Sequence, residues 1–200
     1  KDRIELARVY LAWITSPIFK PGDAEAQIAA RALGGAKSSR LYKKLVYELQ
    51  IAQDVTAQQD SLLLGSAFII QATARPGHTA EEIERVLDAE LERFRGEGPD
   101  AKEVERARNG IETDIVQRLE NFGGDGGVAD RLNHYNHFLG TPGYLDRDLA
   151  RYRAVTPAAV RTFANERLGT AARAVGHAGP GEPDRGQPGP TTPPTASAPG

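Results

Sequence analysis

Two of the four histidines, His134 and His137, have the spacing that most resembles a metal-binding pattern. They would share one face of a helix, but a zinc site also needs a third ligand and, for hydrolysis, a general base. No Asp or Glu lies within Asn133–Leu139, and His78 and His177 stand isolated elsewhere in the chain. The sequence therefore favours an ordinary role on a helix surface over a metal site for this pair.

Two glycine-containing segments are candidates for binding a ligand with their backbone. The segment GGAKSS has a Lys-Ser pair, but a phosphate-binding loop needs a glycine directly before the lysine and a strand before the loop. Here Ala36 precedes Lys37 and the segment follows a helical pattern, so we expect a turn between helices. The loop Gly123–Gly127 could lie against a ligand, but a flexible connection between helices is the better interpretation.

The remaining composition argues against a catalytic constellation in this chain. Cysteine is absent, which excludes disulfides and thiolate ligands, and the carboxylates fall mainly on amphipathic helical patterns. The net charge of −2 gives no electrostatic case for nucleic acid or an anionic membrane as a partner. No stretch approaches the ~18 apolar residues of a membrane span. Because the chain begins at Lys1 and contains no methionine, we expect a piece of a longer polypeptide or a processed product.

Four segments have the pattern of β-strands. Ile4–Thr15 alternates between apolar and polar positions, as a half-buried strand does. Gln53–Asp60 and Leu62–Arg75 follow as two further strands, and Ala171–Ala178 is the last.

Two helices are expected between the first and second strands. Asp23 can cap a helix that runs to about Leu33, where a Gly-Gly pair stops it. Ser38 can cap a second, short helix, whose apolar stripe consists of Leu41, Leu45 and Leu49.

The second half of the chain is mostly helical. Capping boxes at Thr79 and Asp100 begin two long amphipathic helices, whose charged sides we expect to face solvent. Val128–Leu139 and Pro142–Tyr152 are two further helical segments, and Thr156, followed by proline, begins the last.

This order of elements predicts an α+β fold: an antiparallel sheet with helices packed on one face. Residues 1–178 form the expected domain. Residues 179–200 are rich in Pro, Gly, Ser and Thr and have almost nothing to bury, so we expect a disordered tail or linker there.

Three segments together carry a resemblance to a known family. The segment LGGAKSSRLYKKLVYELQIAQDVTA (33–57) resembles the motif LGGG-x-SSRL of the M16, or pitrilysin/insulinase-like, zinc peptidases. GPDAKEVERAR (98–108) resembles a helix start of the same family, and RAVTPAAVRTFANERL (153–168) resembles its closing motif, in the same order. The resemblance extends over roughly residues 4–179.

The resemblance implies a supporting rather than a catalytic role. In this family homologous α+β domains occur in pairs, and two halves close around a peptide. One domain carries H-x-x-E-H, whose histidines bind zinc together with a distal glutamate, while the motif glutamate activates water. This chain has no such motif, so it resembles the non-catalytic domain. We expect no cofactor and no stoichiometric zinc in this chain, and zinc in the partner domain.

A second departure concerns substrate contact. Active members commonly carry an Arg and a Tyr, seven residues apart, that help hold the substrate near the zinc. Alignment on Leu45 places Val46 at the Arg position and Gln53 at the Tyr position, where the family contact is apparently lost. A shifted alignment would use Tyr47 or Lys44 instead.

Two hypotheses of function follow. The first is an inactive, chamber-completing domain of an M16 zinc metalloendopeptidase. It would contact unfolded peptide, for example by adding a strand to its sheet edge, and its partner would be a domain or subunit bearing H-x-x-E-H. The alternative is a pseudopeptidase scaffold or assembly module with no proteolytic role, which loss of the Arg/Tyr pair favours slightly. The sequence does not indicate a cellular compartment.

Overall fold

The computed structural model describes residues 5–124 and 126–179, and most of the expected tail, residues 180–200, lies outside this part of the chain. Its centre is a four-stranded antiparallel sheet in the order β2-β3-β1-β4. The strands are β1 (Arg8–Thr15), β2 (Ala52–Asp60), β3 (Ser66–Ala74) and β4 (Arg173–Ala178). The predicted antiparallel sheet is therefore confirmed.

The two faces of the sheet have different surroundings. On β1, Val9, Leu11 and Trp13 are buried, whereas Arg8 and Ile14, which point to the opposite face, are exposed. The same alternation continues on β3, where every second residue from Ser66 onward is buried. Period-2 alternation of this kind is typical of a sheet that packs against a core on one face only.

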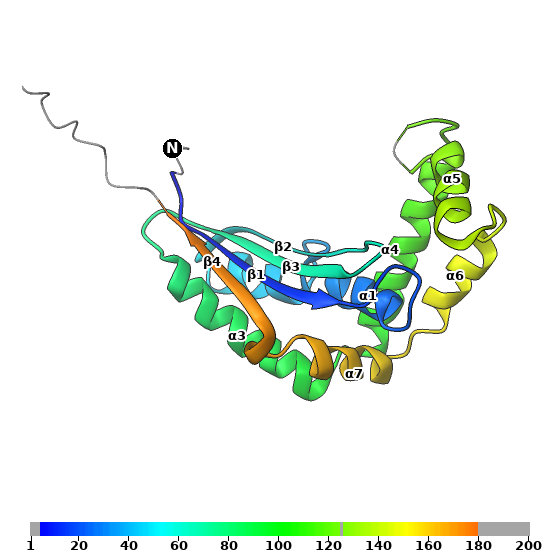
Figure 1. Cartoon of the computed structure of the whole chain (residues 1–200). Helices are drawn as coiled ribbons and strands as arrows, with labels where there is room; N and C mark the ends of the chain where they lie inside the picture. The colour runs from blue at the N-terminus through cyan, green and yellow to red at the C-terminus, as the bar shows by residue number, and fades with distance from the viewer. Residues whose placement is uncertain (1–4, 125, 180–200) are drawn as a thin grey trace, which may run out of the picture.

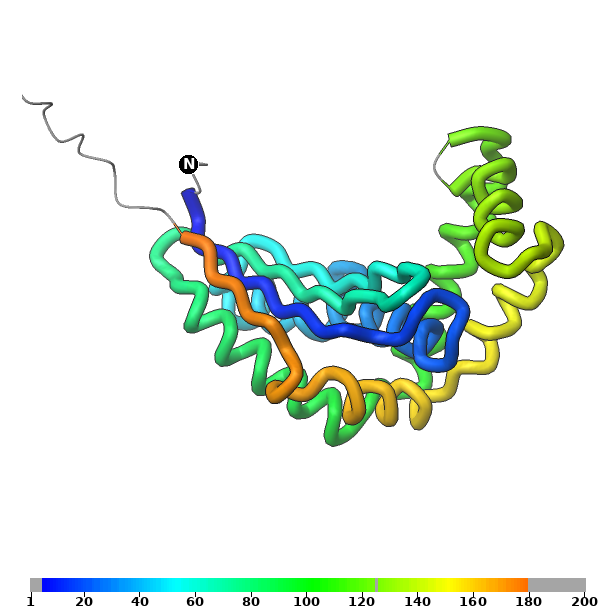
Figure 2. The backbone as a smooth tube through the Cα atoms, in the orientation of Figure 1, coloured from blue at the N-terminus to red at the C-terminus, as the bar shows by residue number. Residues whose placement is uncertain are grey.

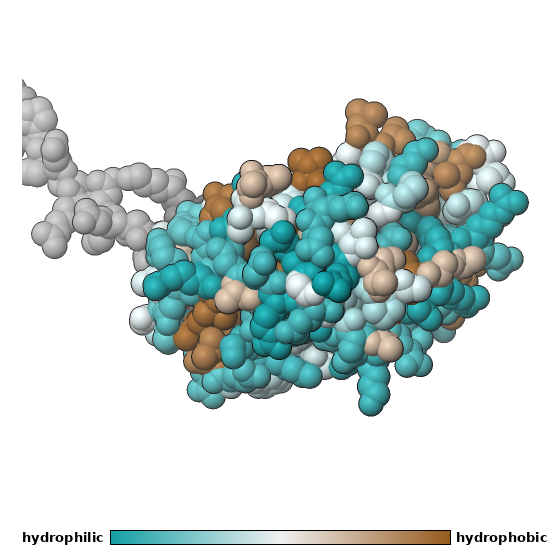
Figure 3. Space-filling model, turned by 90° about the horizontal axis from the view of Figure 1, so that it is seen from below, coloured by the Kyte–Doolittle hydropathy of each residue, from teal (hydrophilic) through white to brown (hydrophobic). Residues whose placement is uncertain are grey.

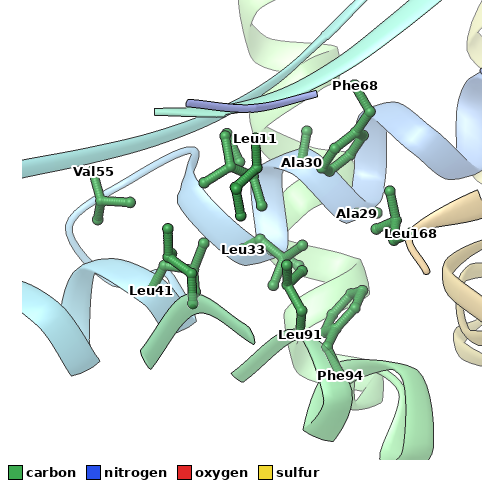
Figure 4. Close-up of a cluster of buried hydrophobic side chains, with 14 of the residues drawn as sticks. Leu11, Ala29, Ala30, Leu33, Leu41, Val55, Phe68, Leu91, Phe94 and Leu168 are labelled. Carbon is green, nitrogen blue, oxygen red and sulfur yellow. The ribbon is translucent and has the colours of Figure 1, made fainter. Parts of the chain in front are cut away.

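Helices cover the apolar face. Figure 1 shows α1 (Asp23–Gly34), α3 (Ala80–Glu97) and α7 (Pro157–Arg167) on one side of the sheet, as the sequence predicts. The core lies between these helices and the sheet, and Figure 4 shows Leu11 and Phe68 of the sheet facing the helical residues Leu33 and Leu91. Seen from the helical side, the surface is mostly hydrophilic (Figure 3), in agreement with solvent-facing charged sides of the helices.

Three further helices extend beyond one end of the sheet. These are α4 (Ala101–Leu119), α5 (Val128–Leu139) and α6 (Leu145–Arg153), and the tube in Figure 2 shows α5 and α6 standing to one side of the sheet. A short 3₁₀ turn, η2 (Thr170–Ala172), leads into β4. Among the described residues, no helix combines the length and apolar character needed to cross a membrane.

The predicted starts of three helices are confirmed at the level of hydrogen bonds. The side chains of Thr79 and Thr156 each accept from a backbone N–H three residues later, both at 3.2 Å. Asp100 accepts from the backbone N–H of Glu103 at 2.7 Å, and Glu103 in turn accepts from the backbone N–H of Asp100 at 2.8 Å, which completes a capping box.

Two other expected caps are wrong. Asp23 is the first residue of α1 rather than its cap, because Gly22 occupies the cap position with φ of 95°. Ser39, not Ser38, precedes the second helix, and its side chain makes no capping hydrogen bond. The expected helix Pro142–Tyr152 also begins later, at Leu145.

The second helix changes type after one turn. It begins as α2 (Arg40–Tyr42) and continues as a π-helical turn, η1 (Lys43–Glu48). Leu41 and Leu45 are buried as expected. The wider turn rotates the residues that follow it, and Leu49 is 43% exposed. The expected stripe of three leucines, spaced four residues apart, is therefore interrupted at its last member.

Candidate functional site

The two predicted substrate positions lie in unlike surroundings. Val46 lies on η1 and is buried in the core, whereas Gln53 is exposed on β2. Gln53 is at the register shift between Ala52 and Asp54, where β2 bulges against β3. A bulge changes the direction of the side chain that it carries. Gln53 is exposed and available for contact, whereas Val46 is buried and is not. Their assignment to the family Arg and Tyr positions stays a prediction.

The residues of the shifted alignment are more accessible than Val46. Tyr47 is 55% exposed and packs edge-on against Tyr42, with ring centroids 5.3 Å apart. Lys44 forms an ion pair with Glu48 at 3.0 Å, one helical turn along the surface. The π turn thus presents Lys44 and Tyr47 at the surface.

The arginine of the SSRL motif has a structural role that its sequence position did not indicate. Arg40 binds Glu103 of α4 through two hydrogen bonds of 2.7 and 2.6 Å, and it donates to the carbonyl of Gly98 at 2.8 Å. Partial burial raises the pKa of Glu103, but the hydrogen bonds and positive charge of Arg40 outweigh this and leave it below the usual value. The motif therefore ties α2 to the start of α4.

A buried ionic network joins α1 to α6. Arg151 binds Asp23 through Nη1 and Asp148 through Nε, both at 2.5 Å, and both aspartates are almost fully buried. Asp148 also accepts from the hydroxyl of Tyr135 at 2.6 Å. Burial lowers the pKa of Arg151, but Tyr152, Asp148 and Asp23 together raise it above its ordinary value. Burial and the bond to Asp148 raise the pKa of Tyr135 to about 12.

The predicted histidine pair does not form a metal site with any group in the described residues. His134 packs on Phe138 and Phe19, with ring centroids 4.4 and 5.9 Å away, and His137 also packs on Phe138, with ring centroids 4.9 Å apart. Burial lowers the pKa of His134. In residues 5–124 and 126–179 no group of three or more His, Cys, Asp or Glu side chains is placed to hold a metal. The donors present do not fit zinc.

One end of the sheet carries a cluster of exposed apolar side chains, which we call the apolar tip: Ile14, Leu62, Leu63 and Leu64. Their exposed fractions are 76%, 59%, 53% and 94%. The end of β1 and the loop between β2 and β3 meet here, since Thr15 pairs with Ser66 and the amide of Ile18 donates to the carbonyl of Leu62. Clustered apolar exposure of this kind marks an interaction surface more often than isolated exposed residues do.

Comparison with known protein families finds a match that extends over more than half of the chain. The sequence profile described as peptidase M16 inactive domain matches residues 1–111. The chain belongs to this family. The predicted M16 resemblance, with a non-catalytic domain of the C-terminal type, is therefore confirmed. The comparison with curated proteins gave no match.

Solved structures show that the whole M16 inactive-domain fold is present. An inactive peptidase domain from Bordetella parapertussis is 22% identical, with a TM-score of 0.79, over 93% of this chain and 97% of that one. A protease from Helicobacter pylori is 19% identical, with a TM-score of 0.77, over 88% of this chain. A chain of complex III2 from Candida albicans is 16% identical, with a TM-score of 0.73, over 88% of this chain.

Two of these three neighbours are much longer than the M16 domain described here. The chain spans 42% of the Helicobacter pylori protease and 43% of the Candida albicans chain. At such identities the likeness concerns the fold alone.

Proposed function

We propose that this M16 inactive domain completes a peptide chamber together with a catalytic M16 domain or subunit that bears H-x-x-E-H and holds the zinc. In this role it contacts unfolded peptide and performs no hydrolysis itself. The proposal assigns all metal chemistry to the partner. In its support, the described residues contain no group of three or more His, Cys, Asp or Glu side chains that could hold a metal ion.

The observation that carries the proposal is the one-sided sheet. The helices lie on one side of the sheet (Figure 1) and pack on the face of Val9, Leu11 and Trp13. The other face presents half-buried and exposed side chains. The apolar tip lies at the end of this sheet and includes Ile14, which points to the open face. Burying four exposed apolar side chains against a second domain is favourable at roughly 25 cal/mol per Å².

The test is hydrolysis by the reconstituted pair. The chain is mixed, with zinc present, with the H-x-x-E-H domain encoded in the same or the adjoining gene, and cleavage of a fluorogenic unfolded peptide is followed. Activity only in the mixture supports the proposal. Inactivity of the mixture contradicts it, whether or not the two domains associate. Zinc measured in each separated component shows which of them holds the metal, and one tightly held zinc per copy of this chain also contradicts the proposal.

A matched pair of variants tests the surface used for pairing. Leu64→Asp places a charge on the apolar tip, and we expect it to weaken association and activity in the mixture. Val116→Asp introduces the same charge at another exposed apolar residue, which lies on α4 away from the tip with an exposed fraction of 54%, and should leave both unchanged. Equal losses in the two variants would contradict a role for the tip.

A scaffold role is the second candidate. It is favoured by the burial of Val46, which leaves that predicted substrate position without a polar group at the surface. The fold is also shared with a chain of complex III2, although at 16% identity. Stable association with the H-x-x-E-H domain, without peptide cleavage by the mixture, supports this candidate over the first.

In the proposed function, the peptide contacts side chains that are accessible at the surface of the domain. Gln53 and Val46 remain our candidates for the positions of the family Tyr and Arg. Of these, Gln53 is exposed and able to donate and accept hydrogen bonds, and Val46 marks a contact that the domain has lost.

A further inference from the structure

A cavity of about 540 Å³ lies between the helical layer and β2. Its walls come from α1, β2, α4, α5 and α6, and a volume of this size falls in the range of small-ligand sites. We call it the arginine cavity, because Arg31, Arg118 and Arg131 line it together with Asp114 and Asp148.

The arginine cavity has more positive than negative charge. Asp114 is paired with Arg31, and Asp148 is already engaged by Arg151 and by the hydroxyl of Tyr135. Arg118 is exposed and has no ion pair with any residue in the described part of the chain. In a chain of net charge −2, this local excess is a property of the cavity and not of the protein as a whole.

Two of the arginines repel each other. Burial lowers the pKa of Arg31, and the positive charge of Arg118 lowers it further. An anion between the two guanidinium groups would remove this repulsion and accept charge-assisted hydrogen bonds, for which the planar fork of arginine suits a carboxylate.

The cavity also runs along β2, which has no second strand partner among the residues that the structure describes. Four consecutive residues of β2, Thr56 to Gln59, line it. Successive side chains of a strand point to opposite faces, so four consecutive lining residues place the cavity at the edge of β2 rather than over one face. In the sheet order β2-β3-β1-β4, β2 is an outer strand, to which an extended chain can add. Thr56, Gln58 and Gln59 lie beside the arginines and offer neutral hydrogen-bonding groups to such a chain.

From these observations we propose that the arginine cavity binds a carboxylate of a peptide that lies along β2, with Arg118 and Arg31 as the recognising groups. The inference rests on the proposed peptide-contacting function and adds the chemical group that is recognised. The carboxylate is either the terminal one of the peptide or that of an Asp or Glu side chain.

Binding to the full chain tests this directly. The probe is an unstructured decapeptide with an N-terminal fluorescein, four Glu residues and a free C-terminus, and its binding is followed by fluorescence anisotropy. Its neutral counterpart has Gln for Glu and a C-terminal amide. Since a hydrogen bond to a charged group is among the strongest that proteins make, we expect the acidic peptide to bind about tenfold more tightly. Equal affinities would overturn the proposal.

Three variants locate the site. Arg118→Gln should weaken binding of the acidic peptide about fivefold or more. Arg85→Gln makes the same charge change on the exposed side of α3 and should have no effect. Asp114→Asn removes a carboxylate that competes for Arg31 and should strengthen binding, an outcome that misfolding would not produce. Equal weakening by Arg118→Gln and Arg85→Gln would overturn the proposal.

Two mixed peptides identify the source of the carboxylate. One has Gln side chains and a free C-terminus, and the other has Glu side chains and a C-terminal amide. Retained affinity in the first assigns the terminal carboxylate, and retained affinity in the second assigns the side chain. Cleavage by the reconstituted pair without a carboxylate preference in the full chain contradicts this inference alone. A carboxylate preference without cleavage contradicts only the proposed function.

Discussion

Removal of the guanidinium of Arg151 is the most direct test of how α6 is held on α1. Arg151 bridges Asp23 and Asp148 at 2.5 Å each, its side chain is 17% exposed, and the side chains of the two aspartates are 0% and 4% exposed. Arg151→Met keeps a long side chain but leaves both buried carboxylates without this partner. Breaking a buried ion pair by removing one member costs about 3–5 kcal/mol, because the remaining charge stays buried and uncompensated.

The loss is measurable in two ways. Urea unfolding followed by circular dichroism should give a free energy of unfolding that is lower by about 3–5 kcal/mol. In a domain of this size that corresponds to a fall of roughly 6–20 °C in Tm. Arg151→Lys should recover only part of the loss, because a lysine cannot reproduce the two-sided fork of arginine.

Arg153 supplies the matched control for this experiment. It lies two residues further along α6 and pairs with Glu112 at 3.0 Å, but its own side chain is 59% exposed. Arg153→Met should therefore have a much smaller effect, as for other ion pairs in contact with water. If Arg151→Met costs no more than Arg153→Met, the bridge does not hold α6 on α1 and the reasoning is wrong.

Three further predictions concern single residues. Gly34→Ala should lower the free energy of unfolding, measured in urea, by about 1–3 kcal/mol, because a Cβ would overlap the backbone of β2. Gly110→Ala should raise it by about 0.5–1 kcal/mol, because a Cβ there would meet only Nη1 of Arg31, at an ordinary contact distance of 3.5 Å. Val46→Arg should lower Tm far more than Gln53→Tyr, since it buries a charge; similar Tm values would contradict the core position of Val46. The pKa of Tyr135 is raised to about 12, so its stabilising contribution is complete below about pH 10 and is lost as the pH rises through 12; Tyr135→Phe should flatten the pH dependence of unfolding in that range.

Features fixed by neighbouring residues could be predicted from the sequence. The caps at Thr79, Asp100 and Thr156 each depend on a hydrogen bond that spans three residues, and all three are confirmed. The cap predicted at Asp23 is wrong, since Gly22 holds the cap position and the carboxylate of Asp23 binds Arg151, which is 128 positions away. No local pattern contains that partner.

The charged groups of the arginine cavity could not be predicted for the same reason. Arg31, Arg118 and Arg131 come from three helices, and each one alone has the appearance of a solvent-facing residue in an amphipathic pattern. Only the packing of α1, α4 and α5 brings them to one cavity. The sequence indicated which residues are charged but not which of them line the same cavity.

The π turn η1 explains both the unexpected exposure of Leu49 and the surroundings of the predicted substrate positions. A π turn contains more residues than an α turn, so it rotates the positions that follow relative to a regular helix. The same widening accounts for the exposure of Leu49 and makes residue counting across η1 an unsafe guide to which side chains face the surface. Val46 faces the core, whereas Tyr47 and Gln53 are exposed. A peptide that lies against this part of the domain therefore has Tyr47 and Gln53 within reach but not the buried side chain of Val46, the residue that we predict to align with the family arginine.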